Sequence, residues 1–135
     1  MRISSSDGKA WIEISRNDEN DFPSFAFACA INIGHGNFAA SNSSLTFLNL
    51  AEFAEALDKF ILQRDIKPSL EGTYDSYLKV WRPNGKNEVM LSFCVGDAFC
   101  GWPGTSEFKL HGEFPIEQEA LNSLVSGFRY MARGT

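Results

Sequence analysis

The chain has 135 residues and a mass of 15.0 kDa, which is the size of one domain. Hydrophobic residues make up 44% and charged residues 21%, so the composition excludes a disordered or a collagen-like chain, and no apolar run is long enough to span a membrane. With 12 Lys and Arg against 17 Asp and Glu, the net charge is −5, and no basic cluster offers the face that a nucleic-acid-binding protein normally presents. We therefore expect a single globular domain over residues 1–135, with no nucleic-acid or membrane partner.

The cysteines and the N-terminus predict a reducing compartment. Cys29, Cys94 and Cys100 are odd in number and show no CxxC spacing, so they indicate neither a disulfide framework nor a zinc site. Residues 1–7 lack the apolar stretch of a signal peptide. Together these features favour a cytoplasmic protein.

Three strand-like segments come first in the chain. Residues 9–16 contain a short β-type run, and residues 25–33 alternate large and small side chains with period two. A glycine turn at 34–36 leads into a third expected strand at 37–41. A polar loop over 17–21 separates the first two strands.

The first helix is expected over residues 50–61, where apolar residues recur at helical spacing. Asn49 is the expected N-cap residue, and Glu52, three positions later, resembles the second half of a capping box. Glu55 and Lys59 lie one turn apart on the opposite face and form a favourable charge pair.

The second half of the chain repeats this order of elements. The expected elements are strands over 76–81, 88–95 and 108–114 and a helix over 116–128. Residues 83–86 have turn chemistry, and residues 96–104 are expected to form a loop that contains Gly, Pro and aromatic residues.

The order of elements is therefore βββαβββα. Because most connections are short, neighbouring strands should pair antiparallel. The sequence thus predicts an α+β fold with one mostly antiparallel sheet of about six strands and two helices.

The two histidines form no recognisable catalytic pattern. His35 lies between two glycines, and His111 lies in a strand between charged neighbours. No HExxH, Walker loop, GxSxG or GxGxxG motif occurs. We therefore expect no catalytic residue, no cofactor and no enzymatic activity.

Three carboxylates, Asp18, Glu19 and Asp21, lie within four positions of the polar loop. Calcium binds such oxygens, but the segment lacks the spacing, the glycine and the terminal glutamate of an EF-hand. We interpret it as a solvated acidic loop and expect no metal. The alternative is a contact site for a basic partner.

Most aromatic residues fall at positions that predict burial, but the 96–104 loop differs. Phe99 and Trp102 lie there, close in sequence to Asp97. A loop aromatic either covers the end of a sheet or is presented to a partner, where tryptophan is common among the residues that carry binding energy. The residues expected to contact or steer a protein partner are Asp18, Glu19, Asp21, Asp97, Phe99 and Trp102.

Several segments spread over residues 9–130 share a family resemblance. They are GNFAA at 36–40 with residues 45–57, YLKV at 77–80 with EVMLS at 88–92, and residues 108–121. These segments resemble the WapI-type immunity proteins and related small bacterial domains. The resemblance implies a small cytosolic protein that binds and neutralises the toxin domain of a polymorphic toxin, often an RNA-cleaving nuclease. An acidic inhibitor of this kind is suited to the basic cleft of a nuclease.

Two other functions stay open. An enzyme or small-ligand-binding domain would hold a pocket between the sheet and the helices, with His111 or Cys94 as candidate residues. A structural or oligomerising module would pair through an exposed sheet edge or face. The sequence does not predict the oligomeric state.

Overall fold

The computed structural model of the protein describes residues 1–17, 24–83, 87–101 and 104–133. These residues form two four-stranded antiparallel sheets and two helices. The first sheet holds β1 (Arg2–Ser4), β2 (Ala10–Asn17), β3 (Ser24–Asn32) and β4 (Asn37–Leu45), in that order. The second holds β5 (Ser69–Glu71), β6 (Tyr77–Trp81), β7 (Val89–Gly101) and β8 (Gly104–Ile116), also in chain order. The remaining elements are α1 (Leu50–Phe60), the short 3-10 turn η1 (Thr73–Asp75) and α2 (Gln118–Arg133).

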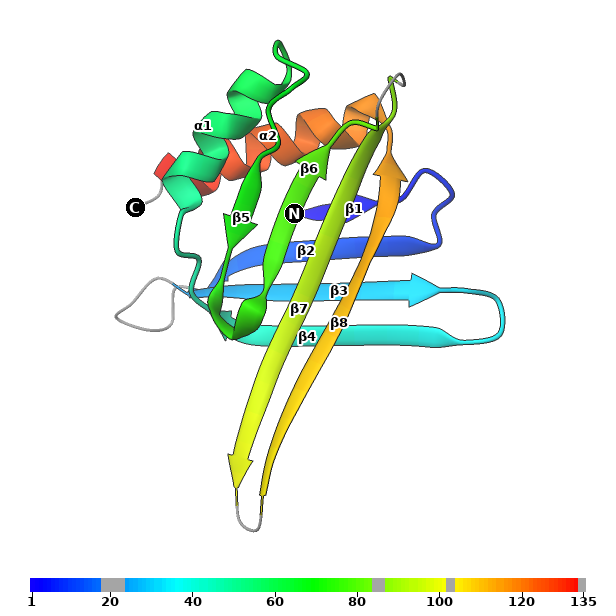
Figure 1. Cartoon of the computed structure of the whole chain (residues 1–135), viewed down its shortest axis with the longest axis vertical. Helices are drawn as coiled ribbons and strands as arrows, with labels where there is room; N and C mark the ends of the chain where they lie inside the picture. The colour runs from blue at the N-terminus through cyan, green and yellow to red at the C-terminus, as the bar shows by residue number, and fades with distance from the viewer. Residues whose placement is uncertain (18–23, 84–86, 102–103, 134–135) are drawn as a thin grey trace.

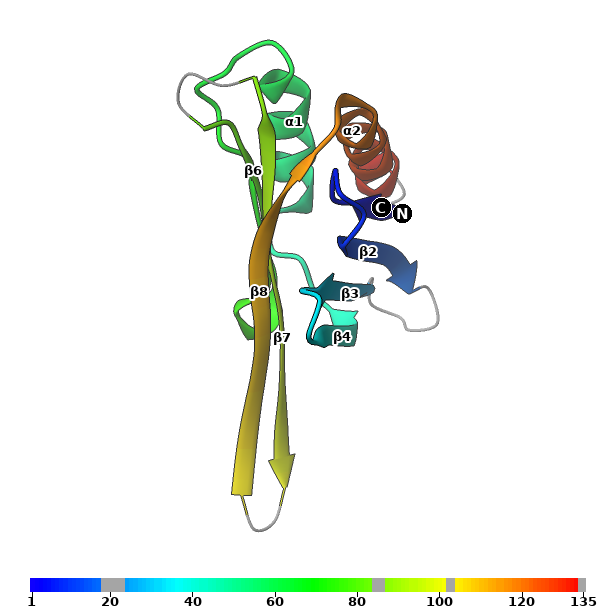
Figure 2. The same ribbon diagram turned by 90° about the vertical axis from the view of Figure 1, so that its right-hand side faces the viewer.

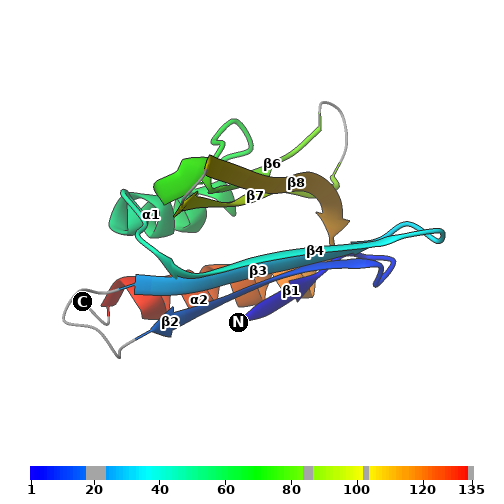
Figure 3. The same ribbon diagram turned by 90° about the horizontal axis from the view of Figure 1, so that it is seen from below.

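These elements are arranged in two layers (Figures 1 and 2). The second sheet is one layer, and α1, α2 and the first sheet together form the other. The strands of the first sheet run across those of the second, and Figure 3 shows the two sheets from below as separate layers. The β7–β8 hairpin continues past β4, so its far end is not covered by the first sheet.

One hydrophobic core connects both layers. Phe27 of β3 and Phe93 of β7 are fully buried, which shows that each sheet turns one face inward. Phe53 of α1 meets Phe128 of α2 edge to face, with ring centroids 4.8 Å apart. Each such buried side chain stabilises the fold by about 1.5–3 kcal/mol through the area removed from water.

The first helix forms where the apolar spacing predicts it. Its charge pair is confirmed, with Glu55 Oε1 and Lys59 Nζ 3.5 Å apart. Asn49 is the N-cap residue, as expected, but its side chain makes no capping bond to the start of α1, so the capping box is wrong. Instead its amide donates to the Ser69 carbonyl and its oxygen accepts the Glu71 N–H, both at 2.8 Å. The Asn49 side chain therefore hydrogen-bonds to the backbone of the edge strand β5 and not to the free N–H groups at the start of α1.

The α+β class is confirmed, but the single sheet of about six strands is wrong. Eight strands in two sheets are found in the described ranges, and the order is ββββαββββα. The two additional strands, β1 and β5, have three residues each and are too short to show an alternating pattern. The sheets are separate because α1 carries the chain from β4 into contact with the other layer before β5 begins.

The loop expected over residues 96–104 is also wrong. Pairing of β7 with β8 continues through Asp97 opposite Phe108 as far as Gly101 opposite Gly104. Strand β7 therefore continues through Gly96 to Gly101, although the glycines of this segment are typical of a loop.

The backbone N–H and C=O of Gly96 link the hairpin to the rest of the protein through hydrogen bonds. Because β6 begins at Tyr77, opposite Cys94, no strand among the described residues pairs with β7 on that side further along. The Gly96 N–H donates instead to Ser76 Oγ, and the Asn42 side-chain amide donates to the Gly96 carbonyl, both at 3.0 Å. Ser76 and Asn42 are buried, so both layers are linked at this point.

Gly96 is also a position where a side chain has no room. A Cβ there would overlap the carbonyl oxygen of Tyr74 in η1. Tyr74 and Asp75 both have positive φ, 58° and 59°, a conformation that costs non-glycine residues about 1–3 kcal/mol each. The strained turn η1 therefore packs closely against β7 at Gly96, because this residue has no side chain.

We predict that Gly96→Ala destabilises the protein by about 1–3 kcal/mol, because the added methyl group must displace backbone. Gly104→Ala is the control, because a Cβ at position 104 meets no atom within 4 Å. Denaturant unfolding of both variants measures the difference. Equal free energies of unfolding in the two variants would show that the packing of η1 against β7 does not require glycine at position 96.

Candidate functional site

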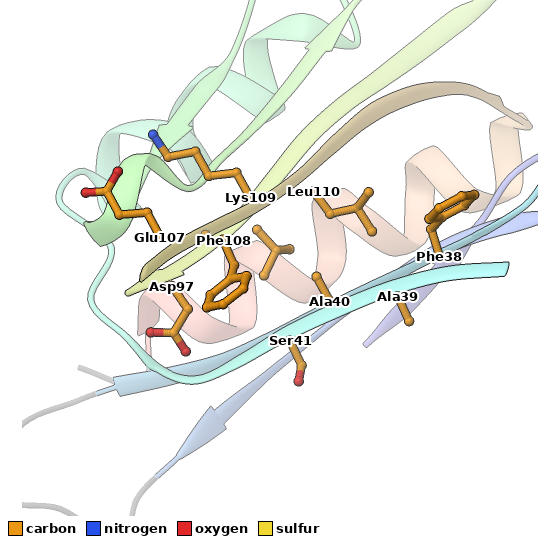
Figure 4. A pocket seen from close by; sticks show the side chains of 11 residues that line it. Phe38, Ala39, Ala40, Ser41, Asp97, Glu107, Phe108, Lys109 and Leu110 are labelled. Atoms are coloured by element: carbon orange, nitrogen blue, oxygen red, sulfur yellow. The ribbon is translucent and has the colours of Figure 1, made fainter. Parts of the chain in front are cut away.

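A groove of about 600 Å³ lies between β4 and the inner face of the β7–β8 hairpin. Figure 4 shows Phe38 and Ala40 pointing from β4 toward the hairpin, and Phe108 and Leu110 pointing from β8 toward β4. The walls of the groove are therefore mostly apolar, and each wall is a β-strand with a fixed backbone.

The apolar inner face of the hairpin becomes exposed along its length. Val95, close to the body, is 2% exposed, whereas Phe108 is 63% exposed and Phe99 is 66% exposed. All three lie on one face, because Val95, Asp97 and Phe99 alternate along β7 and Asp97 is paired with Phe108. We call residues 97–101 and 104–108 the overhang, since this part of the hairpin extends beyond the cover that β4 provides.

Negative charge predominates on the overhang. Asp97 lies on the inner face, and Glu107 lies on the outer face. The nearby cation, Lys109 Nζ, is 2.6 Å from Asp75, and this hydrogen bond holds the pKa of Asp75 below its usual value. The ion pairs found between described residues do not include Asp97 or Glu107. The groove thus combines apolar walls with the carboxylate of Asp97, which has no ion pair with a described residue, whereas Glu107 lies on the outer face and interacts with Lys109.

The structure brings together part of the site that the sequence predicts. Asp97 and Phe99 both lie on the inner face of the overhang, as strand residues and not as loop residues. The other four predicted residues lie outside the residues that the structure describes: Asp18, Glu19, Asp21 and Trp102.

Sequence reasoning missed Phe38, Phe108 and Leu110. Phe108 alternates with charged residues, so it was expected on a buried strand face. Alternation identifies the apolar face of a strand but not whether another element covers it. One usable signal was the absence of charge in β4, which indicates an edge that is not protected.

The residues named for an enzymatic alternative are not arranged as an activated pair. Cys94 and His111 are opposite each other on β7 and β8, but Cys94 is buried and its burial raises the thiol pKa. Burial likewise raises the pKa of Cys29 to about 11. A thiol with a raised pKa is a poor nucleophile, because the thiolate is the reactive form.

The groove does not lie between the sheet and the helices, where the small-ligand-binding alternative would place a pocket. The space between α1, α2 and the sheets is filled by the core, and the groove lies at the open end of the first sheet. Within residues 1–17, 24–83, 87–101 and 104–133, no three His, Cys, Asp or Glu side chains gather as metal ligands. In the same residues, no helix is long and apolar enough to cross a membrane.

Comparisons with known proteins do not assign this chain to a family. No family model, no curated protein and no solved structure matches it. The resemblance to the WapI-type immunity proteins therefore stays a prediction. The structure defines the chain as an α+β protein of two antiparallel sheets. A groove with mostly apolar walls and an acidic side chain, Asp97, lies at the open edge of the first sheet.

We predict that Phe108→Ala changes the free energy of unfolding by no more than about 0.5 kcal/mol, because the ring is mostly exposed. Phe93→Ala, in the core of the same hairpin, should cost about 3–5 kcal/mol. Denaturant unfolding compares the two. Similar losses in both variants would show that Phe108 belongs to the core and not to a binding surface.

The thiols provide a second prediction. In the native protein at pH 8, a thiol reagent should modify Cys100, which is exposed, and spare the buried Cys29 and Cys94. Absorbance titration should count one reactive thiol before unfolding and three afterwards. Modification of a second thiol in the native state would contradict the packing of β3 and β7.

Proposed function

We propose that this protein binds a partner protein in a stoichiometric complex and neutralises it, with the groove between β4 and the overhang as the docking surface. The observation that carries the proposal is the exposure of Phe99 and Phe108 on a strand face that is buried closer to the body, at Phe93 and Val95. Contiguous exposed apolar surface on a soluble protein is typical of an interaction site.

The composition of the groove supports a protein as the ligand. Aromatic side chains are enriched in protein interfaces, and Phe38 and Phe108, which line the groove, are each at least half exposed, as is Phe99 farther along the overhang. The groove is open along its length and its walls are strands, which suits an extended protein surface better than an enclosed small molecule.

Charge supports a basic partner. The net charge is −5, and Asp97 places a carboxylate on the inner face of the overhang beside Phe108, with no ion pair to a described residue. Complementary charge accelerates encounter and disfavours acidic competitors. A toxin domain with a basic substrate cleft, as the resemblance to immunity proteins implies, has this chemistry, and its neutralisation would follow from occlusion of that cleft.

The proposal predicts a one-to-one complex with a basic protein encoded by one of the two genes that flank this one. Phe108→Lys should weaken that complex about thirtyfold, the effect of an interface residue worth ~2 kcal/mol. The matched control is Tyr130→Lys, because Tyr130 is 80% exposed on α2, away from the groove. Calorimetric titration of the purified proteins measures all three affinities.

Each outcome of this titration decides a separate point. Failure of both flanking gene products to bind the wild-type protein would overturn the proposed function. A complex that tolerates Phe108→Lys but not Tyr130→Lys would move the docking surface to α2.

A further inference from the structure

Of the four outermost strands that the structure describes, β4 alone is long and lacks both charge and proline, and the end of β7 beyond β6, residues 97–101, is short and carries Asp97. The edge strands β1 and β5 have three residues each, whereas β8 has 13 residues with charged side chains and Pro115 along it. β4 has nine residues, with no charge and no proline. Natural sheets normally protect a long edge with such residues, because an unprotected edge is a template for another strand.

The register of β4 shows which of its backbone groups are available. The Ile33 N–H donates to the Gly36 carbonyl, and paired residues in an antiparallel ladder are bonded at every second position. Phe38 and Ala40 therefore bond to β3, whereas Ala39 and Ser41 direct their N–H and C=O groups to the open edge. Of the strands described, β3 alone is paired with β4.

The overhang projects in the direction in which the first sheet would grow (Figures 1 and 2). From Leu110 to Gly104, β8 extends about 20 Å at ~3.3 Å per residue. Because neighbouring strands lie about 4.8 Å apart, this length covers the width of at least two added strands. An added strand would have hydrogen-bonding groups on one side and the apolar inner face of the overhang above it.

We propose that the partner binds by contributing an extended segment that pairs with β4 as a fifth strand of the first sheet. This inference rests on the proposed function and specifies its binding mode. Alternate side chains of the segment face the overhang, where apolar ones contact Phe99 and Phe108 and a Lys or Arg pairs with Asp97. Backbone bonds then provide affinity, and the side chains of one face provide specificity.

Charge distinguishes this occupant from a second copy of the chain. Pairing of β4 with its own copy would place two overhangs on one face of a joint sheet, each with Asp97 turned toward that sheet. Like charges brought together in an interface disfavour the pairing. A basic segment is instead attracted by the Asp97 carboxylate, so charge favours a basic partner over a second copy of this chain.

Ala39→Pro tests the backbone pairing. The side chain of Ala39 points away from the groove, and its N–H points to the open edge, so proline removes one outward donor without breaking a bond to β3. Ala39→Thr is the matched control, because it also enlarges the side chain but keeps the N–H. With the flanking gene product that binds the wild type, we expect at least about tenfold weaker binding for Ala39→Pro and a change within about twofold for Ala39→Thr.

Amide hydrogen exchange of the wild-type protein tests the same pairing without any substitution. The N–H groups of Ala39 and Ser41 should exchange rapidly in the free protein and become protected in the complex. Those of Phe38 and Ala40, which already bond to β3, serve as internal controls and should be protected in both states.

The outcomes separate this inference from the proposed function. If the wild type binds its partner but Ala39→Pro binds equally well and the Ala39 amide stays unprotected, strand addition is overturned and the proposed function stands. If neither flanking gene product binds the wild type, the proposed function itself fails. If the wild type alone is a dimer that Ala39→Pro converts to a monomer, a second copy occupies the edge and the inference is overturned.

Discussion

The two hydrogen bonds of the Gly96 backbone are the interactions on which the functional surface of this protein depends. The Gly96 N–H and C=O are buried where β6 no longer accompanies β7, and two side chains from distant segments satisfy them. A buried N–H or C=O without a hydrogen-bond partner costs about 1–3 kcal/mol. Asn42 and Ser76 avoid this cost only when Gly96 lies beside them, so they fix the place where the hairpin leaves the body. The absence of a side chain at the same residue allows the strained turn η1 to pack against β7.

The direction of the hairpin creates the groove. Up to Val95 the inner face of the hairpin is covered by the helices and the first sheet, and beyond it the same face continues into solvent with Phe99 of β7 and Phe108 of β8. β4, the last strand of the first sheet, ends that cover and leaves its own backbone edge open. Apolar surface and unpaired backbone groups therefore lie side by side, and a single extended segment would satisfy both.

The site was only partly accessible from the sequence. Asp97 and Phe99 were named as partner-contacting residues because of their position in an expected loop, yet they lie on a strand and owe their exposure to the length of the hairpin. Phe38 and Phe108 were missed because alternation marks a strand face without showing what covers it. Coverage depends on elements that are distant in the sequence, so no local pattern reports it.

What the sequence by itself determined is local: the α+β class, the antiparallel pairing of neighbouring strands and the two amphipathic helices, because periodicity and short connections act between residues close in the chain. Only the tertiary structure decided the division into two sheets, the open edge of β4 and the overhang. The bond from Asn42 to Gly96 spans 54 positions, and contacts of that range depend on how whole elements pack. The groove therefore arises from packing between two layers, each of which the sequence describes only in part.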